Sequence, residues 1–211
     1  MEVKIFPNGI YGATTYLIYD KKSLEGAIVD CTSSVDEISN FIKEKNINLK
    51  YILITHGHFD HVYCISDMKE KNPTAQVLMH KDDMDLLNDV GSYCLMAGVE
   101  GIKVPCVDGL LDKNSHNLTL GDKEIKLIHT NGHSKGGMCY LIDNILFSGD
   151  TLFEGSIGRC DLPGGSFSEI EKSIKEKLFI LPEEIVVYPG HGDKTTIGYE
   201  KKYNPYFGFE N

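Results

Sequence analysis

The stretch YILITHGHFDH, residues 51–61, joins an apolar run to a cluster of metal-binding side chains. Its first four residues are all apolar, which predicts a strand that is covered on both faces. Residues two apart in extended chain point the same way, so His56 and His58 can aim at one point. A turn would then bring Asp60 and His61 to a second point nearby. The alternatives are a histidine-rich surface loop and a helix cap made by Asp60.

Three later segments each place another metal-competent side chain directly after a predicted strand. They are TNGHS (residues 130–134), SGDT (residues 148–151) and PGHG (residues 189–192). Strand ends at one edge of a sheet converge in space, and glycines beside the side chain let the backbone approach closely. We therefore expect His133, Asp150 and His191 to join the first cluster.

The complete set holds five histidines and two aspartates, namely His56, His58, Asp60, His61, His133, Asp150 and His191. One zinc ion takes about four ligands, so the set suits two ions. The spacing favours a first ion held by His56, His58 and His133. It favours a second ion held by Asp60, His61 and His191, with Asp150 bridging the two. Nitrogen and oxygen donors without thiolate suit Zn²⁺, and also iron or manganese.

Two ions about 3.5–4 Å apart can share a water molecule and lower its pKa from about 15.7 to about 7. A bridging hydroxide is then available at neutral pH, and no serine or cysteine nucleophile is required. The sequence therefore predicts a metal-dependent hydrolase with two divalent ions as cofactors. Asp60 is the side chain that we also assign to catalysis.

These blocks together resemble the metallo-β-lactamase superfamily, specifically its glyoxalase II-like hydrolases. The matching blocks are THGHFDH, NGHSKGGMCY, SGDTLF and YPGHGDKTTIGYEKKYNPY, while GSIGRCDLPGGS is similar to a loop of short bacterial members. The resemblance implies an α+β fold, a four-layer αββα sandwich with a dinuclear site at one edge. It also implies hydrolysis of S-acyl thioesters such as S-lactoylglutathione, as in hydroxyacylglutathione hydrolases. The seven residues above match the metal ligands of the family.

The chain departs from classical glyoxalase II enzymes, which carry a helical C-terminal domain that binds glutathione. We expect one domain over residues 1–211 without that addition. The remaining candidates for substrate contact are Lys135, Tyr140 and Arg159. A core position on a strand is an equal alternative for Tyr140. An ion pair with Asp161 is the favoured interpretation of Arg159.

Other activities of the superfamily stay open at this point. The GR-x-D loop also resembles persulfide dioxygenases, in which His56, His133 and Asp150 alone would hold one Fe(II). Lactonase and β-lactamase activities are further alternatives. The absence of a secretory pattern at the N-terminus counts against a β-lactamase, because that enzyme meets its drug outside the cytoplasm.

Composition narrows the partners and the compartment. The formal net charge is −10, so the surface repels phosphates and a nucleic-acid partner is not expected. No apolar run approaches the roughly 18 residues of a membrane helix. The N-terminal residues show no signal-peptide pattern, so we expect a cytoplasmic protein with reduced cysteines. The expected partner is a small-molecule thioester, and a homodimer stays open. Residues 91–115 are expected to form a long surface excursion, with a lid over the site as one hypothesis.

Residues outside these blocks receive plainer interpretations. His80, His116 and His129 are expected at the surface or behind the ligands. Asp30 follows a predicted strand and could orient a ligand histidine from behind.

Overall fold

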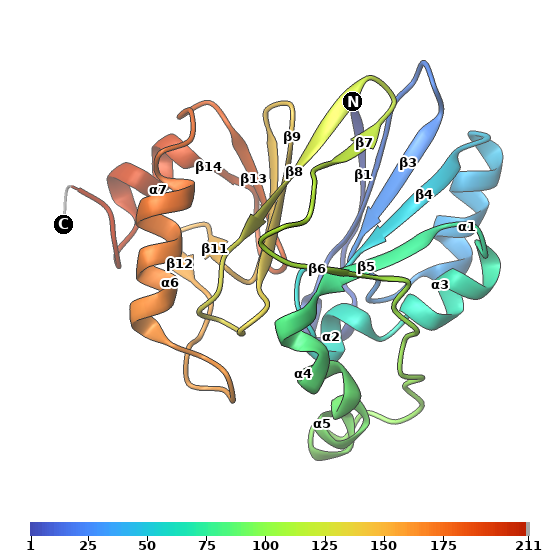
Figure 1. The fold of residues 1–211 in the computed structure, drawn as a ribbon, viewed down its shortest axis with the longest axis horizontal. Coiled ribbons are helices and arrows are strands. Elements are labelled where there is room, and N and C mark those ends of the chain that lie inside the picture. Colours follow the sequence, from blue (N-terminus) through green and yellow to red (C-terminus); the bar gives the residue numbers. More distant parts are fainter. Residues whose placement is uncertain (210–211) are drawn as a thin grey trace.

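The computed structural model describes residues 1–209, which form two six-stranded sheets packed face to face (Figure 1). The first sheet keeps its strands in chain order, antiparallel from β1 to β3 and parallel from β3 to β6. Its strands are β1 (Glu2–Phe6), β2 (Thr15–Tyr19), β3 (Glu25–Val29), β4 (Asn48–Leu53), β5 (Gln76–His80) and β6 (Gly109–Leu111).

The second sheet has the order β14-β13-β10-β9-β8-β7. The pair β10 and β13 is parallel, and the other neighbours are antiparallel. Its strands are β7 (Leu118–Leu120), β8 (Lys123–His129), β9 (Met138–Ile142), β10 (Ile145–Gly149), β13 (Val186–Pro189) and β14 (Thr195–Thr196). A small separate hairpin joins β11 (Leu152–Phe153) to β12 (Ser156–Ile157).

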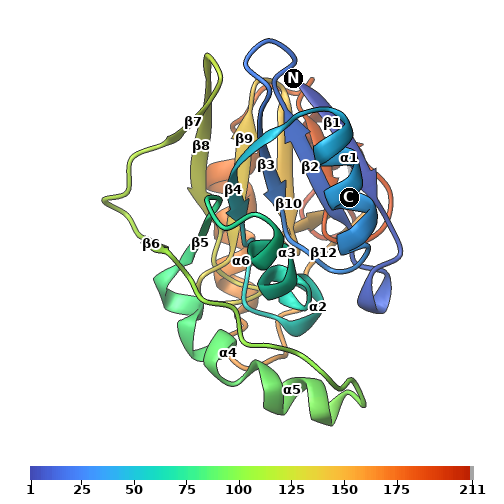
Figure 2. The same cartoon turned by 90° about the vertical axis from the view of Figure 1, so that its right-hand side faces the viewer.

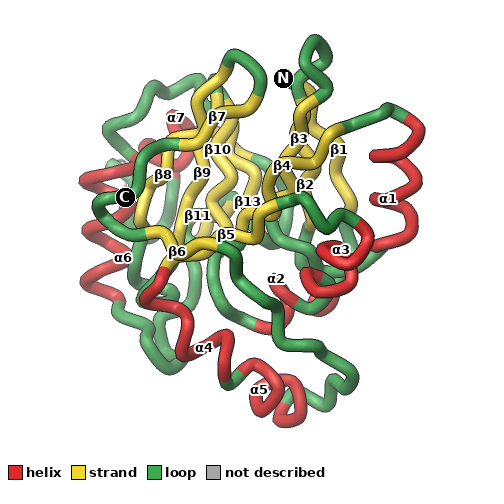
Figure 3. Tube along the Cα trace, turned by 45° about the vertical axis from the view of Figure 1, so that its right-hand side comes forward, coloured by secondary structure: helices red, strands yellow, loops and turns green. Residues whose placement is uncertain are grey.

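Helices cover the outer faces of both sheets (Figures 1 and 3). The first sheet carries α1 (Val35–Glu44) and α3 (Ile65–Lys71). The second carries α6 (Phe167–Ser173), which continues as η3 (Ile174–Leu178), and α7 (Ile197–Tyr203). None of the helices within residues 1–209 combines the length and the apolar composition that crossing a bilayer would require.

The remaining short helices gather at one end of the sheets, as Figure 2 shows for α2, α4 and α5. They are η1 (Ile10–Gly12), α2 (Phe59–Val62), η2 (Lys81–Asp83), α4 (Met84–Asn88) and α5 (Val90–Met96). The C-terminal ends of β4, β8, β10 and β13, which lead into the histidine and aspartate segments, lie at this same end. The arrangement places the site between the two sheets rather than on either one.

Three separate apolar cores confirm the four-layer αββα sandwich. Strand side chains alternate between two of these cores, because successive residues point to opposite faces. Leu17 of β2 packs under the helices, while its neighbour Ile18 packs between the sheets. In β9, Leu141 belongs to the core under α6, while Tyr140 lies between the sheets. Each sheet is therefore buried on both faces, which explains the continuous apolar runs in the sequence.

Two segments near the site have an irregular local structure. The helical segment after β4 is interrupted at Tyr63 and Cys64, where the Cys64 backbone N–H donates to the carbonyl of Cys31 (2.8 Å). The preceding helix α2 starts at Phe59, so Asp60 and His61 lie on a helical turn. The expected excursion over residues 91–115 is partly regular, since it contains most of α5 and all of β6.

Candidate metal centre

The first group of imidazoles consists of His56, His58 and His133. The Nδ1 atom of His58 lies 2.9 Å from Nε2 of His133, which lies 3.2 Å from Nε2 of His56. Their ligand-type atoms fall within 4.8 Å of one another. His133 donates its Nδ1 proton to the carbonyl of Arg159 (2.8 Å), which leaves its Nε2 lone pair facing the group. The three nitrogens could therefore hold one ion.

The second group consists of Asp60, His61 and His191. The Nε2 atoms of the two histidines are 3.2 Å apart, and Oδ2 of Asp60 lies 3.3 Å from Nε2 of His191. Asp150 lies between the two groups. Its Oδ1 is 3.3 Å from His61 Nε2, and its Oδ2 is 3.6 Å from the Nε2 atoms of both His133 and His191. The structure thus brings together all seven residues that the sequence singled out.

The oxygen atoms of Asp150 suit a cation. Oδ1 is buried and accepts no well-aligned hydrogen bond within the described chain, which is unusual for a buried carboxylate. Gly190 allows this crowding, because a Cβ at that position would overlap Asp150 Oδ1 and lie 2.6 Å from His61 Cε1. Imidazole nitrogens and carboxylate oxygens without thiolate fit zinc, iron or manganese. The residues present therefore fit a pair of divalent ions.

Asp30 holds two of the histidines from behind, as expected for one of them. Its Oδ2 accepts a hydrogen bond from Nδ1 of His61 (2.8 Å) and another from the Thr55 hydroxyl (2.7 Å). That hydroxyl lies 3.0 Å from Nδ1 of His56 and can accept its proton. Both rings are thereby fixed with Nε2 toward the centre, which is the usual role of a carboxylate behind a metal-binding histidine.

A second buried aspartate, Asp83, ties two ligand-bearing loops together. Its carboxylate accepts hydrogen bonds from the backbone N–H groups of Gly57 (3.0 Å) and Gly136 and from the hydroxyl of Ser134 (2.7 Å). Gly57 sits between His56 and His58, and Ser134 follows His133. Asp83 therefore sets the spacing of the first group without touching its rings.

Ser134 also stands in the sequence GHSKG, residues 132–136, which has the G-x-S-x-G spacing of a serine nucleophile. The structure gives it a different role. Its side chain is fully buried and its hydroxyl is committed to Asp83. Ser134 is thus part of the support for the first histidine group.

The two groups differ in their protonation. Burial, reinforced by neighbouring histidines, lowers the pKa of His56 well below its usual value and that of His58 to about 4. Burial also acts to lower the pKa of His61 and His191, but the carboxylates of Asp150 and Asp60 outweigh it and raise both. Burial opposes ionisation of Asp150, yet His61 holds its pKa well below the ordinary value. The metal-free protein therefore holds protons more readily on His61 and His191 than on His56 and His58.

A pocket of about 410 Å³ opens onto both groups. His58, Asp60, His133, Asp150 and His191 form its metal-binding floor. Its walls are mostly apolar and come from η1, α2, α4, α5 and the loop after β12, contributed by Tyr11, Phe59, Leu86, Tyr93, Met96, Ala97, Arg159, Leu162 and Pro163. Part of the expected excursion thus forms a fixed wall of the site in this structure.

The three expected substrate contacts have different outcomes. Arg159 lines the pocket and also makes the expected ion pair, a bidentate one with both carboxylate oxygens of Asp161 (2.7 Å each). Lys135 is exposed and lines a smaller neighbouring pocket. Tyr140 lies outside both pockets, contrary to its expected substrate contact. It is fully buried between the sheets, and its hydroxyl donates to the carbonyl of Ile54 (2.7 Å), which matches the core alternative.

The other histidines lie away from the centre. His80 and His129 stack at 4.0 Å with nearly parallel rings. Nitrogens of parallel rings cannot both point in plane at one ion, so this pair is unsuited to chelation. His129 instead pairs through Nε2 with the carbonyl of Lys135 (2.8 Å).

Sequence reasoning missed several residues around the site. Asp83 is one of several acidic residues in KDDMD, residues 81–85, and nothing local marks it as buried. Tyr11 and Met96 lie far from every motif and reach the pocket only through tertiary packing. A glycine-flanked tyrosine in NGIYG, residues 8–12, was the one signal for an unusual backbone at Tyr11.

Comparison with known proteins agrees with this geometry. The family model described as the metallo-beta-lactamase superfamily matches residues 9–191. The probable metallo-hydrolase YqgX of Bacillus subtilis is 34% identical, with 98% of this chain and 97% of the relative covered. Hydroxyacylglutathione hydrolase GloC of Haemophilus influenzae is 30% identical, with 98% of both chains covered.

Solved structures give the same result. BLEG-1, a B3 metallo-beta-lactamase, superimposes with a TM-score of 0.88 at 32% identity, covering 97% of this chain and 99% of that one. The di-iron-bound form of TTHA1623 has a TM-score of 0.84 at 29% identity, covering 97% of this chain and 100% of that one. With the family match, the full-length relatives and the shared sandwich, the chain belongs to the metallo-beta-lactamase superfamily.

Proposed function

We propose that this protein is a metal-dependent hydrolase that cleaves S-acyl thioesters of small molecules in the cytoplasm. The observation that carries the proposal is the pair of three-residue groups joined by Asp150 at the floor of an open pocket. Seven such donors exceed the needs of one ion and suit two. The likeness to a hydroxyacylglutathione hydrolase supports a thioester as substrate.

Two divalent ions, most readily Zn²⁺, would supply a hydroxide nucleophile at neutral pH and polarise the substrate carbonyl. His56, His58 and His133 would hold one of them, Asp60, His61 and His191 the other, and Asp150 both. Asp30 and Asp83 keep these side chains oriented. The apolar walls shield the carbonyl group from bulk water, which strengthens polar interactions at the floor.

Asp60 is the carboxylate that we assign to proton transfer. It lines the pocket, and although burial opposes its ionisation, His61 and His191 lower its pKa. It therefore stands ionised and able to accept the proton that water loses in becoming the hydroxide nucleophile. After hydroxide has added to the carbonyl carbon, the C–S bond breaks and the same proton passes to the leaving thiolate. The products are a carboxylic acid and a free thiol. Arg159 lines the same pocket and is the one lysine or arginine among its described lining residues.

A substrate panel on metal-loaded protein tests the proposal. S-acyl thiols, lactones and persulfides would be assayed on zinc-, iron- and manganese-loaded protein, with metal content measured for each. Release of free thiol from S-acyl thiols, at rates well above those for lactones, is the expected result. If lactones were turned over faster than S-acyl thiols, the proposed thioesterase function would be wrong and the protein would be a lactonase.

The competing function is a persulfide dioxygenase with one Fe(II) on His56, His133 and Asp150. The complete second group of Asp60, His61 and His191 favours the dinuclear hydrolase, because a single iron would leave those donors unused. The assay separates the two functions by stoichiometry. One iron per chain together with oxygen uptake on glutathione persulfide would overturn the thioesterase.

A further inference from the structure

The mouth of the pocket has an apolar lip, formed by Tyr11, Phe59, Met96 and Ala97. The ring of Tyr11 meets that of Phe59 edge to face, with centroids 5.4 Å apart. The Tyr11 hydroxyl donates to the carbonyl of Ala97 at 3.2 Å, which ties η1 to the end of α5. Three elements that are remote in sequence therefore meet in one surface beside the metal-binding floor.

The apolar lip is exposed to an extent that is unusual for such side chains. Met96 is 85% exposed and Tyr11 is 64% exposed. Clustered apolar exposure at the rim of a polar cleft marks a place where another apolar group binds. The apolar lip belongs to the same pocket as the candidate metal centre. The apolar group that binds to the lip is therefore part of the substrate.

The backbone of Tyr11 supports this interpretation. Tyr11 has φ 52° and ψ 23°, in the left-handed region that bulky residues rarely adopt. Such strain persists where surrounding contacts hold it, and it concentrates at ligand sites. Here the strained conformation presents the ring to Phe59 and the hydroxyl to α5. The conformation thus places the aromatic ring at the pocket mouth.

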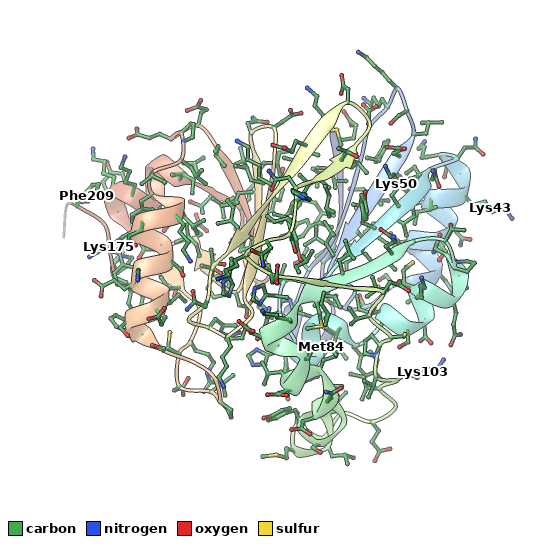
Figure 4. The ribbon with its side chains drawn as sticks, in the orientation of Figure 1. Lys43, Lys50, Met84, Lys103, Lys175 and Phe209 are labelled. Carbon is green, nitrogen blue, oxygen red and sulfur yellow. The ribbon has the colours of Figure 1, made fainter. Side chains whose placement is uncertain are left out.

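Another part of the pocket wall carries its one guanidinium. This part comes from Arg159, Leu162 and Pro163, and Arg159 is the sole lysine or arginine among the pocket's described lining residues. Its guanidinium is already paired with Asp161. Lys43, Lys103 and Lys175 lie at the periphery of the molecule and point outward, as Figure 4 shows. The pocket therefore offers little to a carrier that bears several carboxylates.

We infer that the apolar lip binds the acyl group of the thioester, so that the enzyme selects an apolar acyl chain rather than a polyanionic thiol carrier. The inference rests on the proposed thioester hydrolysis. The orientation follows from the lining of the pocket, because the apolar lip suits a hydrocarbon chain and the wall that carries the one guanidinium is left for the thiol. The acyl chain then extends toward Tyr11 and Met96, and the thiol leaves past Arg159.

The test compares acyl chains on one uncharged thiol. Acetyl, butanoyl, hexanoyl and octanoyl thioesters of N-acetylcysteamine would be assayed on the metal-loaded protein. We expect kcat/KM to rise about twofold per added methylene, which corresponds to half of the free energy of burying a methylene completely. Octanoyl has about six methylenes more than acetyl, so its kcat/KM should be higher by about 60-fold. For one acyl group, the glutathione thioester should be no better than the N-acetylcysteamine thioester.

The double variant Tyr11→Ala, Met96→Ala tests the apolar lip itself. The octanoyl-to-acetyl ratio should fall to about tenfold or less in this variant, because much of the buried apolar area is removed. Ile180→Ala is the matched control, since Ile180 is 73% exposed and lies outside the pocket. Metal content must be equal in all three proteins.

Binding supplies a readout that does not depend on turnover. Non-hydrolysable S-alkyl thioethers of N-acetylcysteamine, titrated by calorimetry into the loaded and metal-free proteins, should bind more tightly as the alkyl chain lengthens, and this trend should weaken in the double variant. A flat series, or a preference for glutathione thioesters, would overturn the inference while leaving thioester hydrolysis intact. Failure to hydrolyse any thioester would overturn the proposed function and the inference with it.

Discussion

The two halves of the candidate metal centre are built in different ways. The group of His56, His58 and His133 is positioned mainly through the backbone. The Asp83 carboxylate accepts hydrogen bonds from backbone N–H groups of the loops that carry these histidines. In the other half, Asp30 bonds directly to the ring of His61. The first half is all nitrogen, and burial lowers the pKa of His56 and His58, whereas the carboxylates of the second half raise the pKa of His61 and His191.

This difference indicates how the two sites would fill. Neutral imidazoles bind an ion without releasing a proton, whereas protonated ones must lose theirs first. The first half is therefore ready for metal at neutral pH, and the second half binds in competition with protons. Substitutions at each support should separate the two.

The largest effect is expected at the residue that the two halves share. Asp150→Ala removes the carboxylate between them, so the second ion should be lost and turnover should fall on the order of 10³-fold. Metal analysis and kcat/KM on the best thioester measure this. The control is Asp193→Ala, an exposed aspartate two residues beyond His191. Turnover that survives in the Asp150 variant would show that the halves work separately.

Asp30→Asn should act next most strongly, and chiefly on the second half. The amide cannot accept all the hydrogen bonds of His61 and Thr55, so the His61 ring loses its fixed orientation. Metal affinity at the second site should fall about 10- to 100-fold. Competition with a chelator, which resolves two binding steps, measures each affinity, and Asp122→Asn on the surface is the control. Equal weakening of both metal-binding steps would contradict the view that Asp30 acts chiefly on the second half of the centre.

Asp83→Asn should weaken the first half by a smaller factor, about tenfold, because Asp83 supports the loops rather than the rings. The same chelator titration should show the loss in the first binding step. Asp82→Asn is a close control, since the neighbouring Asp82 side chain is 47% exposed. A loss confined to the second step would mean that Asp83 does not position His58 and His133.

The smallest effect concerns the pH dependence of folding in the metal-free protein. The pKa of His58 is lowered from 6.5 to about 4, so its contribution to stability is present above pH 6.5 and is lost as the pH falls toward 4. From pH 7 to pH 6 the loss is about 0.7 kcal/mol. The pKa of His191 is raised, so its contribution is present at low pH and is lost as the pH rises.

Urea unfolding at pH 6, 7 and 8 checks these opposite signs. His58→Asn should reduce the loss of unfolding free energy on acidification, and His191→Asn should reduce the loss at alkaline pH. The two variants serve as controls for each other. If the unfolding free energy of both variants changed with pH in the same way, the two halves would not differ in their electrostatics.

The contrast also shows how far the sequence could lead. The ligand-bearing segments were predictable, because each follows an apolar strand and strand ends converge at a sheet edge. Asp83, Tyr11 and Met96 were not, because they reach the site only through packing between segments that are far apart in the chain. Tyr140 was ambiguous for a related reason. Both faces of its strand are covered, so the sequence gives no local sign of which face a residue occupies.

The contacts between histidines also join distant parts of the chain. His58 and His133 are 75 residues apart, and His61 and His191 are 130 apart. An ion bound at either contact closes a long loop, and restricting the unfolded chain in this way is worth about 4–5 kcal/mol for loops of such length. Each ion is therefore a removable cross-link between the two sheets. Metal supply would then govern the lifetime of the folded protein as well as its activity.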